Sequence, residues 1–289
     1  MKPTSIKDEV VQVSLPQCES KFQWIDEILP FLGSGHYKYR GHADASWPLE
    51  TSIERLNGLF RVKLPGPLLQ ETVLNAFKAS SDLFFDWKPE DELEWFSQIQ
   101  HYGGPTPMLD FTDSFWVALY FAVWPHIQSN AKSDFSVTGI RYTCLPNGLV
   151  FHHPKRLHAR ILAQQGLFLA KTDPQRTMDQ ILHDGGIDFS KATVVDNLEA
   201  ARRVLAPDED SSEVKRITAI RFVFPSSSAH QVLQYLYQMN VTGYSLFPDQ
   251  AGAIQNLKNE FHLLRNLVNK PREGKRAKRS ISKNRNKTH

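Results

Sequence analysis

The sequence of 289 residues contains only two cysteines, Cys18 and Cys144, and they lie far apart. This excludes a framework of paired cysteines and a metal site of the Cys-x-x-Cys kind. The sequence also lacks an unbroken apolar run of about 18 residues, which a membrane-spanning helix requires. Met1 to Leu15 carries charges where a signal peptide is apolar. These absences predict a cytoplasmic protein that does not cross a membrane.

Three common enzyme motifs are also missing. Without Gly-x-Ser-x-Gly, Gly-x-x-x-x-Gly-Lys-Ser/Thr or Gly-x-Gly-x-x-Gly, a serine hydrolase, a P-loop enzyme and a Rossmann dehydrogenase are all disfavoured. His152, His153 and His158 lie close in sequence, but no acid or cysteine stands at ligand spacing and there is no His-Glu-x-x-His. We therefore expect no metal site.

The composition, at 41% hydrophobic and 22% charged residues, is that of a globular protein. The net charge is only +3, but nine of the 34 bases and one of the 31 acids lie in residues 270–289. The rest of the chain is mildly acidic. We expect residues 269–289 to be a basic, disordered tail, either simply solvated or bound to the phosphate backbone of a nucleic acid.

Hydrophobic periodicity predicts the order of the elements. Helices are expected over 21–32, 67–85, 89–102, 115–124, 191–205, 226–237 and 250–267. Strands are expected over 36–41, 106–111, 135–142, 149–151, 166–170 and 217–224, with a last strand or extended segment over 242–248. The expected helix at 115–124 has no polar face, so it should lie deep in the core.

This order has no regular βαβ alternation and predicts the α+β class. We expect one large domain over residues 21–268, with helices packed on a mixed or antiparallel sheet. Residues 1–20 would then be an N-terminal extension. Residues 145–148 are expected to form the turn between the strands at 135–142 and 149–151.

Five short motifs occur along the chain. They are Tyr39-Arg40-Gly41, Trp47-Pro48-Leu49 with Ser52-Ile53, the block from Gln100 to Thr112 with Ala118 to Ala122, Arg160-Ile161 with Gln165 to Phe168, and Leu246-Phe247-Pro248-Asp249. In this combination and order the chain resembles the FRG (Phe/Tyr-Arg-Gly) domain family. Pro107 stands where the family usually has arginine, so any role of that guanidinium must be absent here or filled by another base.

Arg40 stands between Tyr39 and Gly41 on an expected strand and should point to the face opposite Tyr39. A guanidinium suits a phosphate or carboxylate held by two parallel hydrogen bonds, and Gly41 would let a ligand approach the backbone closely. The alternative is a buried ion pair between Arg40 and Asp110 that fixes the fold. The two interpretations are compatible, so Tyr39, Arg40 and Gly41 are binding candidates and Arg40 is also a catalytic candidate.

Asp110 and Thr112 precede an expected helix, at a junction where free N–H groups and the helix dipole favour an anion. The acids Asp110 and Asp113 argue against phosphate there, and N-capping by Asp113 or Ser114 is the alternative. A carboxylate in apolar surroundings requires a partner. Asp110 is therefore a catalytic candidate, with Thr106 and Thr112 as binding candidates.

His101 and Tyr102 end an expected helix and are binding candidates, although a histidine there also suits the helix dipole. Asp249, which follows Phe247-Pro248, is either a catalytic acid or the cap of the last helix.

Arg40 is followed along the chain by Thr112-Asp113-Ser114 before a helix and then by the late acid Asp249. This order is similar to that of ADP-ribosyltransferases, which use Arg, Ser-Thr-Ser and Glu. The resemblance implies a similar fold and NAD as substrate, with its pyrophosphate on Arg40, its nicotinamide on Tyr102 and its ribose facing Asp249. The triplet and the late acid both depart from that pattern.

Two other functions stay open. One is a non-catalytic module that senses a nucleotide or another anion in a toxin role or in bacterial defence against phage. The other is nucleic-acid binding through residues 270–289.

Overall fold

The computed structural model describes residues 6–15, 35–83, 85–129, 131–156, 158–196, 214–250, 252–254, 256–257 and 261. The helix expected over 21–32, most of the one expected over 250–267 and the basic tail lie outside the described residues. No helix within the described ranges is long and apolar enough to span a membrane.

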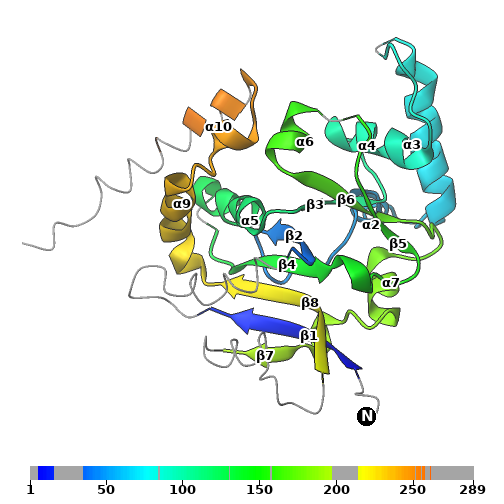
Figure 1. Cartoon of the computed structure of the whole chain (residues 1–289). Helices are drawn as coiled ribbons and strands as arrows, with labels where there is room; N and C mark the ends of the chain where they lie inside the picture. Colours follow the sequence, from blue (N-terminus) through cyan, green and yellow to red (C-terminus); the bar gives the residue numbers. More distant parts are fainter. Residues whose placement is uncertain are drawn as a thin grey trace, which may run out of the picture.

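The described chain forms one α+β domain built on an eight-stranded mixed sheet, as the sequence predicts (Figure 1). The strand order is β5-β6-β3-β2-β4-β8-β1-β7. Only the pairs of β1 with β8 and with β7 are parallel. The strands are β1 (Ile6–Ser14), β2 (Tyr37–His42), β3 (Met108–Thr112), β4 (Phe135–Arg141), β5 (Leu149–His152), β6 (Gly166–Lys171), β7 (Thr193–Val195) and β8 (Val214–Phe224).

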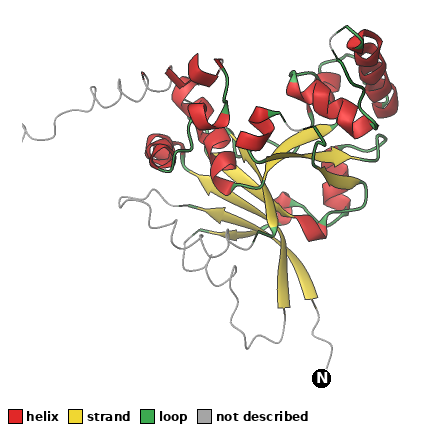
Figure 2. Ribbon diagram, turned by 45° about the horizontal axis from the view of Figure 1, so that its top comes forward, coloured by secondary structure: helices red, strands yellow, loops and turns green. Residues whose placement is uncertain are grey.

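Figure 2 shows the strands as a twisted layer beneath most of the helices. The helices are α2 (Ser52–Gly58), α3 (Gly66–Ser81), α4 (Glu92–His101), α5 (Phe115–Ser129), α6 (Ala159–Ala163), α7 (Met178–Asp184), α9 (Ala229–Gln238) and α10 (Gly243–Leu246). Three single 3-10 turns are η1 (Tyr142–Cys144), η2 (Phe189–Lys191) and η3 (Ser226–Ser228).

Helix α5 forms the centre of the largest core. It packs on β2 and β4 and against α9, and its buried residues include Leu119, Tyr120 and Val123. Its N-terminus is capped by Ser114, whose Oγ accepts a hydrogen bond from the N–H of Val117 at 3.4 Å. The burial expected of a helix without a polar face is confirmed.

Strands β2 and β3 are neighbours in the sheet but pair at a single position, Tyr39 with Thr112. β2 pairs with β4 along its whole length, and β3 pairs with β6 along its whole length. The two strands therefore diverge on either side of one contact. This divergence divides the sheet into a part with β3, β6 and β5 and a part with the other five strands.

The expected N-terminal extension over residues 1–20 instead contains β1, which pairs with β8 and β7. Its charges and its lack of an apolar run argued only against a signal peptide. However, Val11 and Val13 are fully buried, and the exposed Asp8 forms an ion pair with Arg216 of β8. The residues that face outward carry the charge, while the valines join the core.

The segment expected as a strand over 242–248 contains a short helix, α10. The Thr242 side chain accepts a hydrogen bond from the N–H of Ser245, whose hydroxyl accepts one from the N–H of Thr242. This reciprocal cap stabilises a helical turn. The local cap therefore gives a helical turn where a strand or extended segment was expected.

Of two further expectations about the second half of the chain, one is wrong and one is confirmed only in part. Residues 193–195, expected to be helical, form β7, because these β-branched residues pair with β1. The turn expected over 145–148 is present, with the N–H of Leu149 donating to the carbonyl of Pro146 at 3.2 Å. However, β4 and β5 do not form a hairpin, because β2, β3 and β6 lie between them in the sheet and η1 interrupts their connection.

Gly41 on β2 lies directly against the backbone of α5. A Cβ atom at this position would lie 1.9 Å from the carbonyl oxygen of Ala118 and 2.7 Å from the nitrogen of Ala122. Neither backbone atom can move without shifting the helix. The glycine that we expected to admit a ligand is therefore required by the packing of α5 on the sheet.

We predict that Gly41→Ala lowers the free energy of unfolding by about 1–3 kcal/mol or more, because the added methyl group overlaps backbone atoms. Chemical denaturation measures this change. Gly58→Ala is the matched control, since a Cβ atom there meets nothing within 4 Å. Equal stability of the two variants would contradict the close approach of α5.

Candidate functional site

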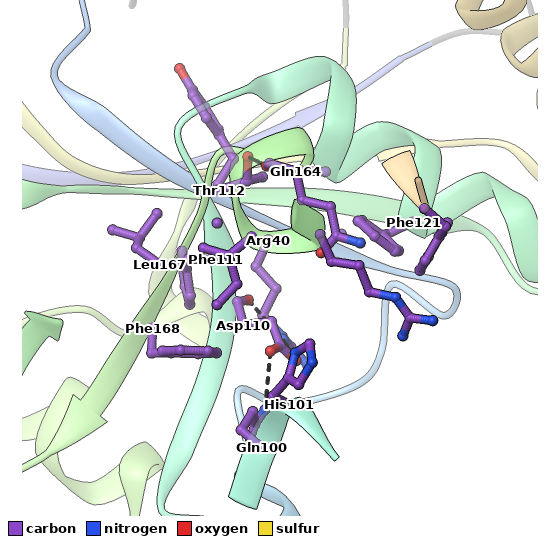
Figure 3. Close-up of a pocket in the computed structure, with 17 residues that line it drawn as sticks. Arg40, Gln100, His101, Asp110, Phe111, Thr112, Phe121, Gln164, Leu167 and Phe168 are labelled. Carbon is purple, nitrogen blue, oxygen red and sulfur yellow. Dashed lines mark hydrogen bonds and ion pairs between the residues drawn. The ribbon is translucent and has the colours of Figure 1, made fainter. Parts of the chain in front are cut away.

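A cavity of about 410 Å³ lies where β2 and β3 diverge (Figure 3). Its lining residues come from β2 and β3, from helices α4, α5 and α6, from the start of β6, and from Phe247 after α10. This volume is in the range of small-molecule binding sites. Of the residues singled out from the sequence, the cavity brings together Tyr39, Arg40, Gly41, His101, Asp110 and Thr112.

Arg40 bridges the two diverging strands. Its Nη1 donates a hydrogen bond of 2.8 Å to the main-chain carbonyl of Asp110 and lies 3.9 Å from that residue's Oδ2. Its Nε donates to Nε2 of His42 at 3.0 Å. The two residues expected to meet do so, mainly through the backbone of Asp110. Because Arg40 satisfies a carbonyl on the strand edge that faces the divergence, it stabilises the walls of the cavity.

His42 is a buried neutral acceptor for Arg40. Burial, followed by the positive charges of Arg40, Arg221 and Arg55, lowers the pKa of His42 to about 3. Its Nε2 accepts from Arg40, so the proton of the neutral ring is on Nδ1. The ring therefore holds the guanidinium of Arg40 in one orientation at neutral pH.

Asp110 presents a carboxylate to the cavity, and this side chain is 67% exposed. The amide nitrogen of Gln100 lies 3.1 Å from both carboxylate oxygens. The amide oxygen of Gln100 accepts a hydrogen bond from the hydroxyl of Thr106, and the N–H of Thr106 donates to Ser52 Oγ at 2.9 Å. Thr106 is fully buried. It lies outside the cavity lining and orients Gln100, which in turn orients Asp110.

Thr112 connects β3 to the end of α6. Its hydroxyl donates a 2.7 Å hydrogen bond to the carbonyl of Gln164 and accepts one from the N–H of Ser114. Asp113 forms an ion pair with Lys38 at 2.5 Å. Of the two expected capping residues, Ser114 caps α5, and Asp113 is not among the residues that line the cavity.

His101 lines the cavity, whereas Tyr102 does not. The ring of His101 stacks on that of His158, with centroids 4.1 Å apart and an angle of 9° between the planes. Burial, then the charges of His158 and Arg160, lower the pKa of His101. Tyr102 is 66% exposed, and its ring lies roughly perpendicular to that of His101, with centroids 5.0 Å apart. Tyr102 is thus placed beside the cavity.

Asp249 is also outside the cavity lining, but it holds a residue that belongs to it. One carboxylate oxygen lies 2.6 Å from Nε of Arg160. The other accepts a 2.8 Å hydrogen bond from the N–H of Gly252, as a helix cap does. The guanidinium of Arg160 in turn lies 5.5 Å from the ring centroid of Phe247. Asp249 therefore contacts the site through Arg160.

Several lining residues were not singled out as site residues, namely Gln100, Phe121, Arg160, Gln164 and Phe247. All but Gln164 stand within the five ordered motifs. Their membership in these motifs was the signal by which the sequence could have identified them as site residues. Gln164 lies next to one motif, and its side-chain amide donates to the carbonyl of Leu246 at 3.1 Å, which attaches α6 to the segment carrying Phe247.

The cavity lining combines charged, polar and aromatic side chains. Arg40, Arg160 and Asp110 supply two positive charges and one negative charge, with neutral donors and acceptors from glutamine side chains. Phe121 and Phe247 meet edge to face, with centroids 5.9 Å apart. Within the described residues, no three His, Cys, Asp or Glu side chains form a group that could hold a metal ion.

Pro107, the residue at which the sequence departs from the resemblance described above, is buried just before β3 and does not line the cavity. Arg160 provides the cavity with a second guanidinium beside Arg40. The cavity therefore contains two guanidinium groups, and neither comes from position 107.

The low pKa of His42 predicts a dependence of stability on pH. Below its unfolded pKa of 6.5, the unfolded chain binds a proton that the folded chain does not, so stability falls as the pH drops from about 6.5 toward 3. Between pH 7.5 and 5, the free energy of unfolding of wild type should fall by about 2 kcal/mol more than that of His42→Gln. Chemical denaturation at each pH measures this difference. The exposed His36→Gln is the control and should keep the wild-type slope. Equal slopes for wild type and His42→Gln would contradict a buried neutral His42.

Comparison with known proteins identifies residues 35–131 as an FRG domain. The match covers about a third of the chain. No curated protein and no solved structure matches the chain. The matched segment begins just before β2 and ends just after α5, so it contains the Arg40 and Asp110 side of the cavity but not Arg160 or Phe247. The chain is therefore an FRG domain-containing protein, with the domain at residues 35–131.

Proposed function

We propose that the cavity binds a nucleotide, with NAD as the leading candidate and ADP-ribosyl transfer as the reaction class. The observation that carries this proposal is the divergence of β2 and β3. It gathers two guanidinium groups, one oriented carboxylate and a pair of aromatic rings in a single cavity of about 410 Å³.

The guanidinium groups provide the phosphate-binding side. Arg40 uses Nε and Nη1 for His42 and Asp110, and its remaining N–H groups have no hydrogen bond to the described part of the chain. Its orientation is fixed before a ligand arrives, which reduces the entropic cost of binding. A guanidinium binds phosphate oxygens in a planar, two-point manner. Arg160 adds a second positive charge, partly balanced by Asp249.

Phe121 and Phe247 provide the surface for a planar ring. They meet edge to face, and both line the cavity. Every base, and nicotinamide too, has a face that stacks on an aromatic side chain. These residues take the place of Tyr102, which lies outside the cavity.

Asp110 is the acid best placed to act on the sugar. In ADP-ribosyl transfer the bond between ribose carbon and nicotinamide nitrogen breaks, the acceptor nucleophile forms the new bond to that carbon, and its proton is released. Positive charge develops on the ribose in the transition state. An oriented carboxylate in the cavity stabilises that charge. Asp249, the sequence-based candidate for this role, is engaged by Arg160 and by the N–H of Gly252.

One observation favours a second proposal, a module that binds the nucleotide without turning it over, as a sensor in bacterial defence would. Asp110 is the only carboxylate among the described residues that line the cavity. ADP-ribosyl transfer with one acid on the ribose and another that activates the acceptor requires two acids. The described lining of this cavity supplies only the first.

Binding is tested by isothermal titration calorimetry with NAD. We expect Arg40→Gln and Arg160→Gln each to weaken binding about 10-fold or more, because each removes charge-assisted hydrogen bonds. Arg216→Gln, which removes an exposed arginine paired with Asp8, should bind as wild type does. Since Arg40 also connects the strands, Arg160→Gln, at a half-buried residue that connects no strands, decides the result if Arg40→Gln is unstable. No binding by wild type would reject the nucleotide site.

Turnover is tested by nicotinamide release from NAD, with cell extract as a source of acceptor. Asp110→Asn should lower the rate about 100-fold, a loss typical of one electrostatic group in a transition state, whereas Asp249→Asn should have a smaller effect. If wild type binds NAD but releases no nicotinamide, the sensor proposal replaces the transferase.

A further inference from the structure

We infer that the cavity selects a ribonucleotide, with Asp110 accepting hydrogen bonds from the 2′- and 3′-hydroxyls of the ribose. This inference rests on the proposed nucleotide site and names the sugar that it takes. It starts from the carboxylate of Asp110, which faces the cavity and is 67% exposed although three residues of the chain are used to orient it.

A chain of hydrogen bonds that begins at the buried Thr106 fixes the orientation of Asp110. Ser52 accepts from the N–H of Thr106, the hydroxyl of Thr106 donates to Gln100, and the amide of Gln100 donates to both oxygens of Asp110. Because Thr106 donates to the amide oxygen of Gln100, the amide nitrogen must point to Asp110. Each carboxylate oxygen keeps further acceptor capacity, since an ionised carboxylate offers about four lone-pair positions.

The charges around Asp110 determine which ligand group it accepts. A phosphate is repelled by the carboxylate. An ammonium group is disfavoured because Nη1 of Arg40 lies 3.9 Å from Oδ2, and Arg160 lines the same cavity. A neutral donor remains, and two neighbouring hydroxyls match the two oxygens of one carboxylate. A ribose with a free 2′,3′-diol is the part of a nucleotide that has this arrangement, and its phosphates then face the guanidinium groups.

The inference is tested by calorimetric titration with ADP-ribose and with a dideoxy analogue that lacks the 2′- and 3′-hydroxyls of the distal ribose, the ribose that carries nicotinamide in NAD. Wild type should bind ADP-ribose about 10- to 100-fold more tightly, because the dideoxy compound loses hydrogen bonds to a charged acceptor. In Asp110→Asn the amide removes the charge and one acceptor, so the preference should fall below about threefold. Asp113→Asn is the matched control, because Asp113 pairs with Lys38 outside the cavity lining, and it should keep the full preference.

A positioning role is separated from direct contact by Thr106→Val. This variant removes the hydroxyl that orients Gln100 but no group that lines the cavity. It should lower the preference for ADP-ribose only in part, while its affinity for the dideoxy compound stays at the wild-type value.

The outcomes distinguish this inference from the function on which it rests. If wild type binds the two compounds equally, or if Asp110→Asn keeps the full preference, the ribose inference is wrong and the nucleotide site stands. If wild type binds neither compound, the proposed nucleotide site fails and the ribose inference fails with it.

Discussion

The hydrogen bond from Arg40 to the main-chain carbonyl of Asp110 connects two strands that otherwise meet at one residue pair. Without further pairing, diverging strands leave backbone groups that must find other partners. Arg40 supplies one, and the buried neutral ring of His42 holds it in place. The same side chain thus connects the two parts of the sheet and lines the cavity. This double use explains why the interpretations of Arg40 as a structural residue and as a ligand-binding residue are compatible.

Helix α5 forms another wall of the cavity. Gly41 allows the helix to lie directly on β2, and this contact brings Ala118 and Phe121 to the cavity. On the other side, the paired Arg160 and Asp249 and the bond from Gln164 to Leu246 attach the segment with Phe247 to α6. The matched FRG domain at residues 35–131 therefore forms only part of the site. Residues far along the chain complete it.

Much of the fold and part of the site were predictable from the sequence. The apolar helix α5 and strands β2 and β3 follow from periodicity, which is a local signal, and the meeting of Arg40 with Asp110 follows from the need of a carboxylate in apolar surroundings for a partner. The strand β1 was missed because its outward charges hid its buried valines, and α10 because a reciprocal cap forms a helical turn where a strand or extended segment was expected. The divergence of β2 from β3 depends on pairings with β4 and β6, which no local pattern encodes. The roles of Phe247 and Arg160 depend on that divergence.

A nucleotide bound where β2 and β3 diverge should be visible in a crystal structure of the protein soaked with ADP-ribose. We expect the ligand between Arg40 and the pair Phe121 and Phe247, with a phosphate in hydrogen-bond contact with Arg40 and a ribose hydroxyl in contact with Asp110. Density for the ligand elsewhere on the surface, or an empty cavity at saturating ligand, would contradict the account.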